Sequence, residues 1–289
     1  MDLATFLGEE RTAQPGVALT DYLQHLSASS VGMLFRCPRQ FQQRYILGRK
    51  ERPGEAPVVG SFLHETLEWN YGQKIDSHAD YPVTDALQYL QDVAVPKVVE
   101  EEGGVDNIRW DSNFEQARKD ADRVTNSYWR GVVPRIQPIA VEQRFEVWVP
   151  GVEIPVIGYV DTEEELRTLD VKTGRNAQSK VKPSWMLQGR LYAWAKGKPT
   201  EFHSISRAQT PKIVTALESE AMTVPVPTQG QLENTRHLIR TAADLIRYFL
   251  ATYGATEQDW PTWGATPDFT RNMLPCDYCG FRKDCPAWR

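Results

Sequence analysis

The stretch GYVDTEEELRTLDVKTG, residues 158–174, decides which fold and which chemistry this chain of 289 residues predicts. Its pattern is typical of two short strands joined by an acidic turn, Thr162 to Glu165. Because alternate residues of a strand share a face, Asp170 and Lys172 project the same way, roughly 6–7 Å apart. Charged residues are rarely buried unless they are paired or hold a metal ion. The stretch therefore predicts either a salt bridge or a metal site.

Asp161 ends the first of these strands, and it lies beside Asp170 if the two strands pair as a hairpin. Two carboxylates so close repel one another unless a cation lies between them. Their oxygens favour Mg²⁺ or Mn²⁺, and Lys172 is suited to orient or activate water that such a metal polarises. A surface hairpin with a salt bridge is the alternative, because D-x-K alone occurs by chance in most proteins. We expect the three glutamates at 163–165 to form a solvated loop.

Helices are expected before and after these strands. One helix opens near Ser27–Ser30, where serines can cap the first turn, and Cys37-Pro38 interrupts it. A loop is expected over residues 51–60, followed by a helix that begins near Gly60. The remaining helical patterns cover residues 83–101, 113–131, 184–195 and 228–254.

The expected sheet has four strands, over residues 139–149, 153–161, 166–172 and 201–208. In the first of them, alternation places five apolar residues on one side: Ile139, Val141, Phe145, Val147 and Val149. These elements predict the α/β class, as one domain over residues 1–289. Its parts are a mainly helical region, a catalytic sheet and a closing helix with cysteines, over residues 18–135, 138–210 and 228–289.

The composition is that of an ordinary globular protein, with 41% hydrophobic and 25% charged residues. No apolar run approaches the ~20 residues of a membrane helix, and the start lacks the pattern of a secretory signal. We therefore expect a cytoplasmic protein without a membrane part. The net charge of −5 argues against nucleic-acid binding over the whole surface. Basic residues cluster within 36–52 and 172–182, however, which favours local phosphate contact.

The chain has four cysteines: Cys37, Cys276, Cys279 and Cys285. In a cytosolic protein, metal binding is a better first interpretation than disulfides. A zinc knuckle usually takes its fourth ligand from nearby, whereas Cys37 lies far upstream of the other three. An iron–sulfur cluster also takes four thiolates. The residues alone leave zinc and iron–sulfur open.

An ordered set of short motifs resembles the PD-(D/E)XK nucleases, specifically the RecB-like branch that includes CRISPR-associated exonucleases with an iron–sulfur cluster. The resemblance runs from Ser27 to the last cysteine. The motifs are CP with downstream aromatics (Cys37, Pro38, Phe41, Tyr45), G-x-x-x-H (Gly60 to His64), Glu142, G-x-V-D (Gly158 to Asp161), D-x-K-T-G (Asp170 to Gly174), Q-x-x-x-Y (Gln188 to Tyr192) and C-x-x-C-x-x-x-x-x-C. Each motif alone is weak, and the ordered set is specific.

The resemblance implies a restriction-endonuclease-like core, in which helices flank a central mixed sheet, with a helical elaboration before it. It also implies a metal site made by His64, Asp161, Asp170 and the carbonyl of Val171, with Lys172 positioning the attacking water. Asp161 and Asp170 are thereby catalytic residues as well as ligands. Aspartate stands at position 170, where the family more commonly has glutamate.

Three further residues have less specific roles in this resemblance. Gln188 and Tyr192, one helical turn apart, would brace the lysine or touch the DNA backbone, and ordinary helix packing is the alternative. Glu142 either supports the metal site or is a plain edge-strand charge.

The resemblance favours a 4Fe–4S cluster over zinc at the four cysteines, forming a knot at the C-terminal end. It implies a Mg²⁺- or Mn²⁺-dependent deoxyribonuclease that acts as an exonuclease on single-stranded DNA, in the 5′ to 3′ direction. The implied process is DNA recombination, repair, replication or CRISPR spacer acquisition, in a prokaryotic cell or a phage-infected host. The chain has no G-x-x-x-x-G-K-[ST] phosphate loop, so a helicase or a recombination or CRISPR adaptation protein is an expected partner.

Two rival functions remain at this stage: a catalytically inactive iron–sulfur subunit that binds DNA in a nuclease/helicase complex, and a zinc-stabilised binding protein. Oligomeric state and cleavage polarity have no signal in the sequence.

Overall fold

The chain divides into two compact units. The computed structural model describes residues 17–256, 259–262, 276, 279–281 and 285. Unit 1 consists of Met1–Glu51, Glu146–Ile157 and Gly230–Arg289, and unit 2 of Arg52–Phe145 and Gly158–Gln229. The single domain expected from the sequence stays a prediction. Part of the expected closing segment, including residues 263–275, lies outside the described residues.

A mixed sheet forms the centre of the fold, as predicted. In the described residues it has six strands: β1 (Ala140–Val147), β2 (Val156–Glu163), β3 (Thr168–Gly174), β4 (Thr200–Ser206), β5 (Ile213–Val214) and β6 (Thr223–Val224). The order is β1-β2-β3-β4-β5, and β6 pairs with β4. β2 and β3 are antiparallel, with Thr162 opposite Leu169, so the predicted hairpin is present. β3 and β4 are parallel, with Val171 opposite His203.

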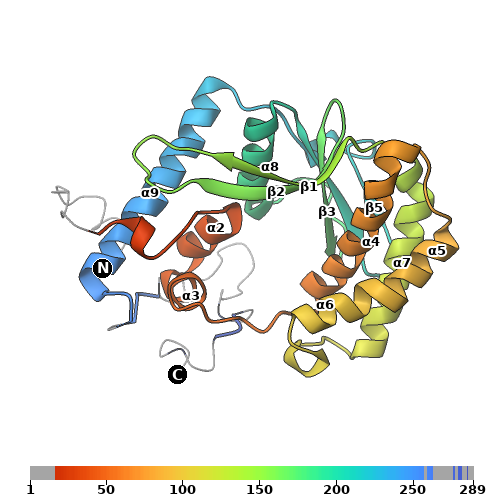
Figure 1. Ribbon diagram of the computed structural model, residues 1–289, viewed down its shortest axis with the longest axis horizontal. Helices are drawn as coiled ribbons and strands as arrows, with labels where there is room; N and C mark the ends of the chain where they lie inside the picture. The colour runs from red at the N-terminus through yellow and green to blue at the C-terminus, as the bar shows by residue number, and fades with distance from the viewer. Residues whose placement is uncertain (1–16, 257–258, 263–275, 277–278, 282–284, 286–289) are drawn as a thin grey trace. The chain divides into compact units, whose positions relative to one another are not determined.

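Helices of unit 2 cover both faces of β3 and β4 (Figure 1). On one face, Leu169 and Val171 pack with residues of α4 (Glu55–Ser77) and α7 (Phe114–Gly131). On the other face, Phe202 packs against α8 (Pro183–Lys196). Because neighbouring residues of a strand point to opposite faces, Asp170 and Lys172 face away from the α4 and α7 side.

The remaining helical segments of unit 2 are short. The region expected as one helix over 83–101 consists of α5 (Val83–Tyr89), the π-helical η3 (Leu90–Ala94) and α6 (Val95–Glu101). Single 3-10 turns occur at η1 (Leu19–Asp21), η4 (Val105–Asn107), η5 (Val133–Arg135) and η6 (Glu220–Met222). No helix in the described part of the chain is both long enough and apolar enough to cross a membrane.

The predicted start of α4 near Gly60 is wrong, because the helix begins at Glu55. Pro57 falls within the first turn, where backbone N–H groups have no partner inside the helix, so proline is tolerated there. The Glu55 carboxylate also accepts hydrogen bonds from the backbone N–H groups of Asp111 and Ser112, at 2.9 and 3.2 Å. These partners lie far along the chain and had no local signal.

The predicted solvated loop at residues 163–165 is also wrong in part. Glu163 is the last residue of β2, is buried, and pairs with Lys196 and Lys198 at 2.7 Å each. Glu164 accepts hydrogen bonds from Arg167 at 2.6 Å and from the backbone N–H of Gln137 at 2.7 Å. Glu165 alone is exposed as expected.

Strand β1 departs from the predicted alternation at Glu142, whose φ of 47° lies in the left-handed region. Val141 packs on the α4 and α7 side, whereas Phe145 packs edge-on against Tyr192 of α8, with ring centroids 5.5 Å apart. Residues four apart in a regular strand share a face, so the irregularity at Glu142 moves Phe145 to the opposite side. Ile139, expected inside, is 50% exposed.

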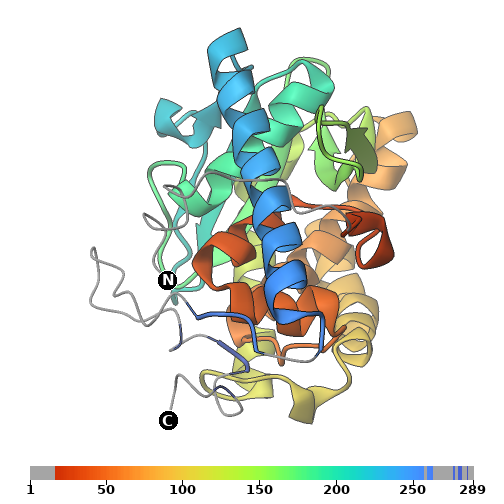
Figure 2. The same ribbon diagram turned by 90° about the vertical axis from the view of Figure 1, so that its left-hand side faces the viewer.

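Unit 1 contains α2 (Ala28–Arg36), α3 (Pro38–Phe41), the π-helical η2 (Gln42–Ile46) and α9 (Gln229–Tyr253), the long helix in front in Figure 2. Ser27 and Ser30 form the predicted cap of α2, and Cys37 separates α2 from α3 as expected. Trp260 is buried between the rings of Phe41 and Phe249, at centroid distances of 6.0 and 5.3 Å. This aromatic contact joins α3 to α9.

Candidate active site

Three potential metal ligands converge in unit 2. His64 of α4, Glu142 of β1 and Asp161 of β2 each present one ligand atom, and these atoms lie within 4.8 Å of one another. His64 Nδ1 lies 3.2 Å from Asp161 Oδ2, and His64 Nε2 lies 2.7 Å from the carbonyl oxygen of Val171. Histidines that bind metals commonly donate their second ring N–H to such a carbonyl. The arrangement leaves Nδ1 directed at the two carboxylates.

The close approach of α4 to β3 places His64 over this site. A Cβ atom at Gly60 would lie 3.0 Å from Thr173 Oγ1, tighter than nearly all contacts of real Cβ atoms. Thr173 also donates a hydrogen bond to the carbonyl of Ala56, at 3.3 Å. His64 follows Gly60 by about one turn of the helix. The glycine of the G-x-x-x-H motif therefore sets the distance at which the histidine meets the sheet.

Glu142 is the residue of the group with an uncommon backbone. Left-handed φ values are rare outside glycine, and they often occur at functional sites. Burial, reinforced by the charge of Asp161, raises the pKa of Glu142 to about 7, and His64 opposes this rise. A carboxylate so placed is disfavoured in its charged form unless a cation offsets the neighbouring charge. Glu142 therefore has the environment of a metal ligand.

Asp170 lies behind this group and is fully buried. Burial and the charge of Asp161 raise its pKa to about 6, although Lys172 opposes the rise. Lys172 Nζ lies 2.7 Å from Asp170 Oδ1 and 3.0 Å from Oδ2, and only the contact with Oδ2 has hydrogen-bond geometry. Burial lowers the pKa of Lys172, but Asp170 and Asp161 outweigh it, so the pKa is raised and the lysine stays charged.

Gln188 and Tyr192 extend this contact from α8. The Gln188 side-chain amide donates hydrogen bonds to Asp170 Oδ2 and to the Tyr192 hydroxyl, both at 2.7 Å. Tyr192 is buried, and burial raises its pKa well above the ordinary value. In this structure the pair therefore holds Asp170 rather than the lysine itself.

The structure thus brings together every residue that the sequence suggested for the nuclease site. His64, Asp161 and Val171 form one group, and Asp170, Lys172, Gln188 and Tyr192 form a second group beside it. Asp161 Oδ2 accepts a hydrogen bond from the backbone N–H of Val171 at 3.4 Å. Val171 lies between Asp170 and Lys172 on β3, so the strand itself holds the two groups side by side. Glu142, left open by the sequence, lies in the first group. Its one sequence signal was an acid in a strand next to the hairpin.

The four cysteines lie in unit 1, and all are half-buried. Burial raises the pKa of Cys37, backbone N–H groups of Gln40 and Arg39 oppose this, and Cys285 and Cys276 add to it. Burial also raises the pKa of Cys279 to about 11, with contributions from Cys37 and Cys276.

The thiols are therefore near enough to influence one another. The backbone N–H of Cys279 donates to the carbonyl of Cys276 at 3.1 Å, which places these two cysteines in one turn. Among the described residues, no three cysteine sulfurs lie within 4.8 Å of one another.

Known proteins resemble this chain in sequence pattern and in fold. A family profile described as the PD-(D/E)XK nuclease superfamily matches residues 25–286. A solved structure of a candidate exonuclease from Eubacterium rectale is 13% identical, with a TM-score of 0.51, over 87% of this chain and 90% of that chain. At this identity the likeness shows the fold alone. A second solved structure, of SSO0001, is 14% identical with a TM-score of 0.35, over 80% of this chain and 95% of that chain. No curated protein matches the sequence.

Proposed function

Because the chain belongs to the PD-(D/E)XK nuclease superfamily, we propose that it is a metal-dependent deoxyribonuclease. The observation that carries this proposal is the convergence of His64, Glu142 and Asp161 on one point beside the Asp170–Lys172 pair. A pseudo-enzyme typically has lost at least one such group. The intact set therefore favours catalysis over the rival function of an inactive binding subunit.

The residues fit a divalent cation. Two carboxylates and one imidazole nitrogen offer the hard and borderline donors that Mg²⁺ and Mn²⁺ accept. Asp170 is proposed as a further ligand because the resemblance to the family implies it. Its buried Oδ1 has no hydrogen bond but lies 2.7 Å from Lys172 Nζ, and Asp170 is not among the three residues whose ligand atoms converge. A cation bound by these residues would supply Lewis-acid stabilisation of the charge that develops on the scissile phosphate.

Lys172 is the residue that we propose to position the attacking water. Its ammonium is held by Asp170 on one side and retains its charge, so it can also stabilise negative charge on the phosphate. Gln188 fixes the Asp170 carboxylate, and Tyr192 fixes the Gln188 amide. The proposed reaction hydrolyses the phosphodiester and leaves a 5′ phosphate and a 3′ hydroxyl.

The finer proposal is an exonuclease that degrades single-stranded DNA from the 5′ end. The RecB-like order of motifs supports it, as does the similarity in fold to a protein described as a candidate exonuclease. The proposed role is end processing in recombination, repair, replication or CRISPR spacer acquisition, alone or with a helicase.

We also propose a 4Fe–4S cluster at Cys37, Cys276, Cys279 and Cys285. The mutual electrostatic effects of the thiols support it, as do the backbone N–H groups directed at Cys37. Iron, acid-labile sulfide and zinc analysis of the purified protein separates this cluster from a zinc site. Zinc without iron would favour the zinc-stabilised alternative.

Cleavage of single-stranded DNA labelled separately at each end, with Mg²⁺ or Mn²⁺, tests the main proposal. We expect metal-dependent cleavage that Lys172→Ala reduces by at least about a hundredfold, and the label released first gives the polarity. Lys198→Ala is the matched control, because Lys198 pairs with Glu163 and not with the site. DNA binding without cleavage by the intact, metal-loaded protein would favour the inactive subunit.

A further inference from the structure

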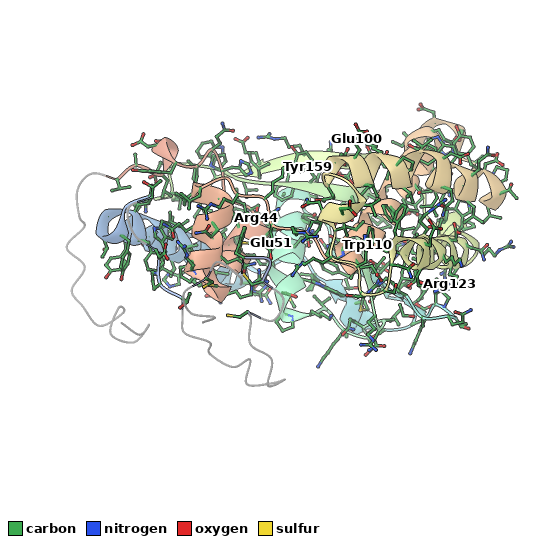
Figure 3. All side chains as sticks on the ribbon, turned by 90° about the horizontal axis from the view of Figure 1, so that it is seen from below. Arg44, Glu51, Glu100, Trp110, Arg123 and Tyr159 are labelled. Atoms are coloured by element: carbon green, nitrogen blue, oxygen red, sulfur yellow. The ribbon has the colours of Figure 1, made fainter. Side chains whose placement is uncertain are left out.

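Tyr159 of β2 presents a large aromatic side chain to solvent, labelled in Figure 3. The residue is 52% exposed. Among the described residues, its side chain has no hydrogen bond and no ring contact. Exposed aromatic residues are common singly, so position rather than exposure decides whether this one has a role.

Its position is next to the candidate active site. Tyr159 and Asp161 are two apart on the same strand, so their side chains leave the same face, roughly 6–7 Å apart. Val160 between them is fully buried on the opposite face.

The backbone that carries Tyr159 is fixed on both sides. Val160 anchors it in the core, and Gly158 lies directly against Phe145, where an added Cβ would be 2.6 Å from the ring. A tyrosine ring on such a backbone loses little conformational freedom when it contacts a ligand, because it has only two side-chain torsions.

The acidic residues of the site make an uncharged contact with DNA favourable at this position. Glu142, Asp161 and Asp170 repel a phosphate backbone until a cation is bound, and the whole chain carries a net charge of −5. Stacking of a nucleobase on an aromatic ring needs no positive charge and tolerates any base. We propose that Tyr159 stacks on the base next to the scissile phosphate and thereby positions single-stranded DNA over the metal site. This inference rests on the proposed nuclease function.

Binding of end-labelled oligo-dT to the full-length protein with Mn²⁺ tests the inference, in a Lys172→Ala background that prevents cleavage. Fluorescence anisotropy should show that Tyr159→Ala weakens binding roughly 5- to 150-fold. Tyr159→Phe, which keeps the ring, should stay within about twofold of the Tyr159 protein. Leu166→Ala is the control, because Leu166 is an 80% exposed apolar residue in the β2–β3 turn.

A series of oligonucleotides, each with one abasic position, then separates stacking from a structural effect. One abasic position should weaken binding to the Tyr159 protein and have no further effect on Tyr159→Ala, because both changes remove the same contact. Additive losses at every abasic position, or unchanged binding by Tyr159→Ala, would overturn the inference. The nuclease proposal would still hold if the protein with Lys172 intact cleaved DNA. A Lys172 protein that neither binds nor cleaves DNA would sink both.

Discussion

At the scale of single residues, Glu142 shows how a local backbone irregularity brings a carboxylate to the candidate active site. A regular strand would carry this carboxylate along the pleat, whereas its left-handed φ directs it to His64 and Asp161. Such a conformation persists only when surrounding structure enforces it. The neighbours that enforce it here are the packing of Val141 on one face and of Phe145 on the other.

Replacing Glu142 by glutamine should weaken Mn²⁺ binding at least about tenfold, because it removes one charged donor and keeps the size of the side chain. Isothermal titration with Mn²⁺ measures this directly. Glu165→Gln is the control, because Glu165 is exposed in the β2–β3 turn. Equal affinities for the two variants would exclude Glu142 from the ligand set. Glu142→Gly should leave the metal-free protein as stable as before, because glycine adopts a φ of 47° without strain.

Only part of this residue-level detail was accessible from sequence. Asp161, Asp170 and Lys172 were predictable because a short hairpin brings residues on neighbouring strands together. The place of Glu142 was not, because a single residue with a left-handed φ in a strand has no compositional signature when that residue is not glycine. The pairing of Glu163 with Lys196 and Lys198 was missed for another reason, since a whole helix separates the partners in the chain.

At the scale of elements, close packing of strands and helices aligns the site. Periodicity does not show that β3 and β4 are parallel. The strands of the hairpin, β4 itself and the long helices were predicted from it, because their apolar residues repeat every 2.0 or 3.6 residues. The first turn of α4 was not, because it depends on Glu55 reaching a distant loop. Contacts of this kind are tertiary and leave no local pattern.

Gly158→Ala should destabilise the fold by about 1–3 kcal/mol, because the new Cβ would overlap the Phe145 ring at 2.6 Å. Chemical denaturation measures the change in the free energy of unfolding. Gly72→Ala is the matched control: it lies in α4 with nothing within 4 Å of an added Cβ, so it should stabilise by up to about 1 kcal/mol. Phe145→Leu should partly rescue Gly158→Ala. A Gly158→Ala protein as stable as the parent would show that the Phe145 ring can move away from the added Cβ at little cost.

Glu201 of β4 predicts that the stability of the fold falls at acid pH. This buried carboxylate contacts Arg167 and His203. Burial acts to raise the pKa of Glu201, but hydrogen bonds from His203 and the Ala216 N–H, with the charge of Arg167, lower it to about 2. A lowered pKa contributes stability above the ordinary value of 4.5, and this contribution is lost as the pH falls towards 2.

Urea denaturation between pH 5 and pH 2 checks this contribution. The difference in unfolding free energy between the parent and Glu201→Gln should shrink by up to about 3 kcal/mol over this range. Comparison with the variant is necessary, because other carboxylates titrate in the same window. A constant difference would show that Glu201 has an ordinary pKa.

At the scale of the whole molecule, the two units carry separate chemistries. All residues proposed for phosphodiester hydrolysis belong to unit 2, and all four cysteines belong to unit 1. The sequence predicted both sets of residues, but it did not indicate that they fall into different compact units. The reason is that unit 1 is assembled from three separate stretches of chain.

Cys37→Ser should therefore remove iron from the protein and leave Mn²⁺ binding at His64, Glu142 and Asp161 within about twofold of the parent. Serine is a favourable residue at the start of a helix, so this variant preserves the beginning of α3 while it removes the thiolate. Iron analysis and Mn²⁺ titration on the same preparation provide the measurement, with Cys37→Ala as a comparison. Full iron content in Cys37→Ser would exclude Cys37 as a cluster ligand.

The discontinuous composition of unit 1 also determines the order in which the protein can be completed during synthesis. Every residue of unit 2 has been translated by Gln229, whereas unit 1 still lacks α9 and three of its four cysteines. Domains generally fold as they leave the ribosome. Unit 2 can therefore fold first. Cys37 is translated early, and the other three cysteines are translated only after unit 2 is complete. The cluster proposed for the four cysteines would then assemble after unit 2 has folded.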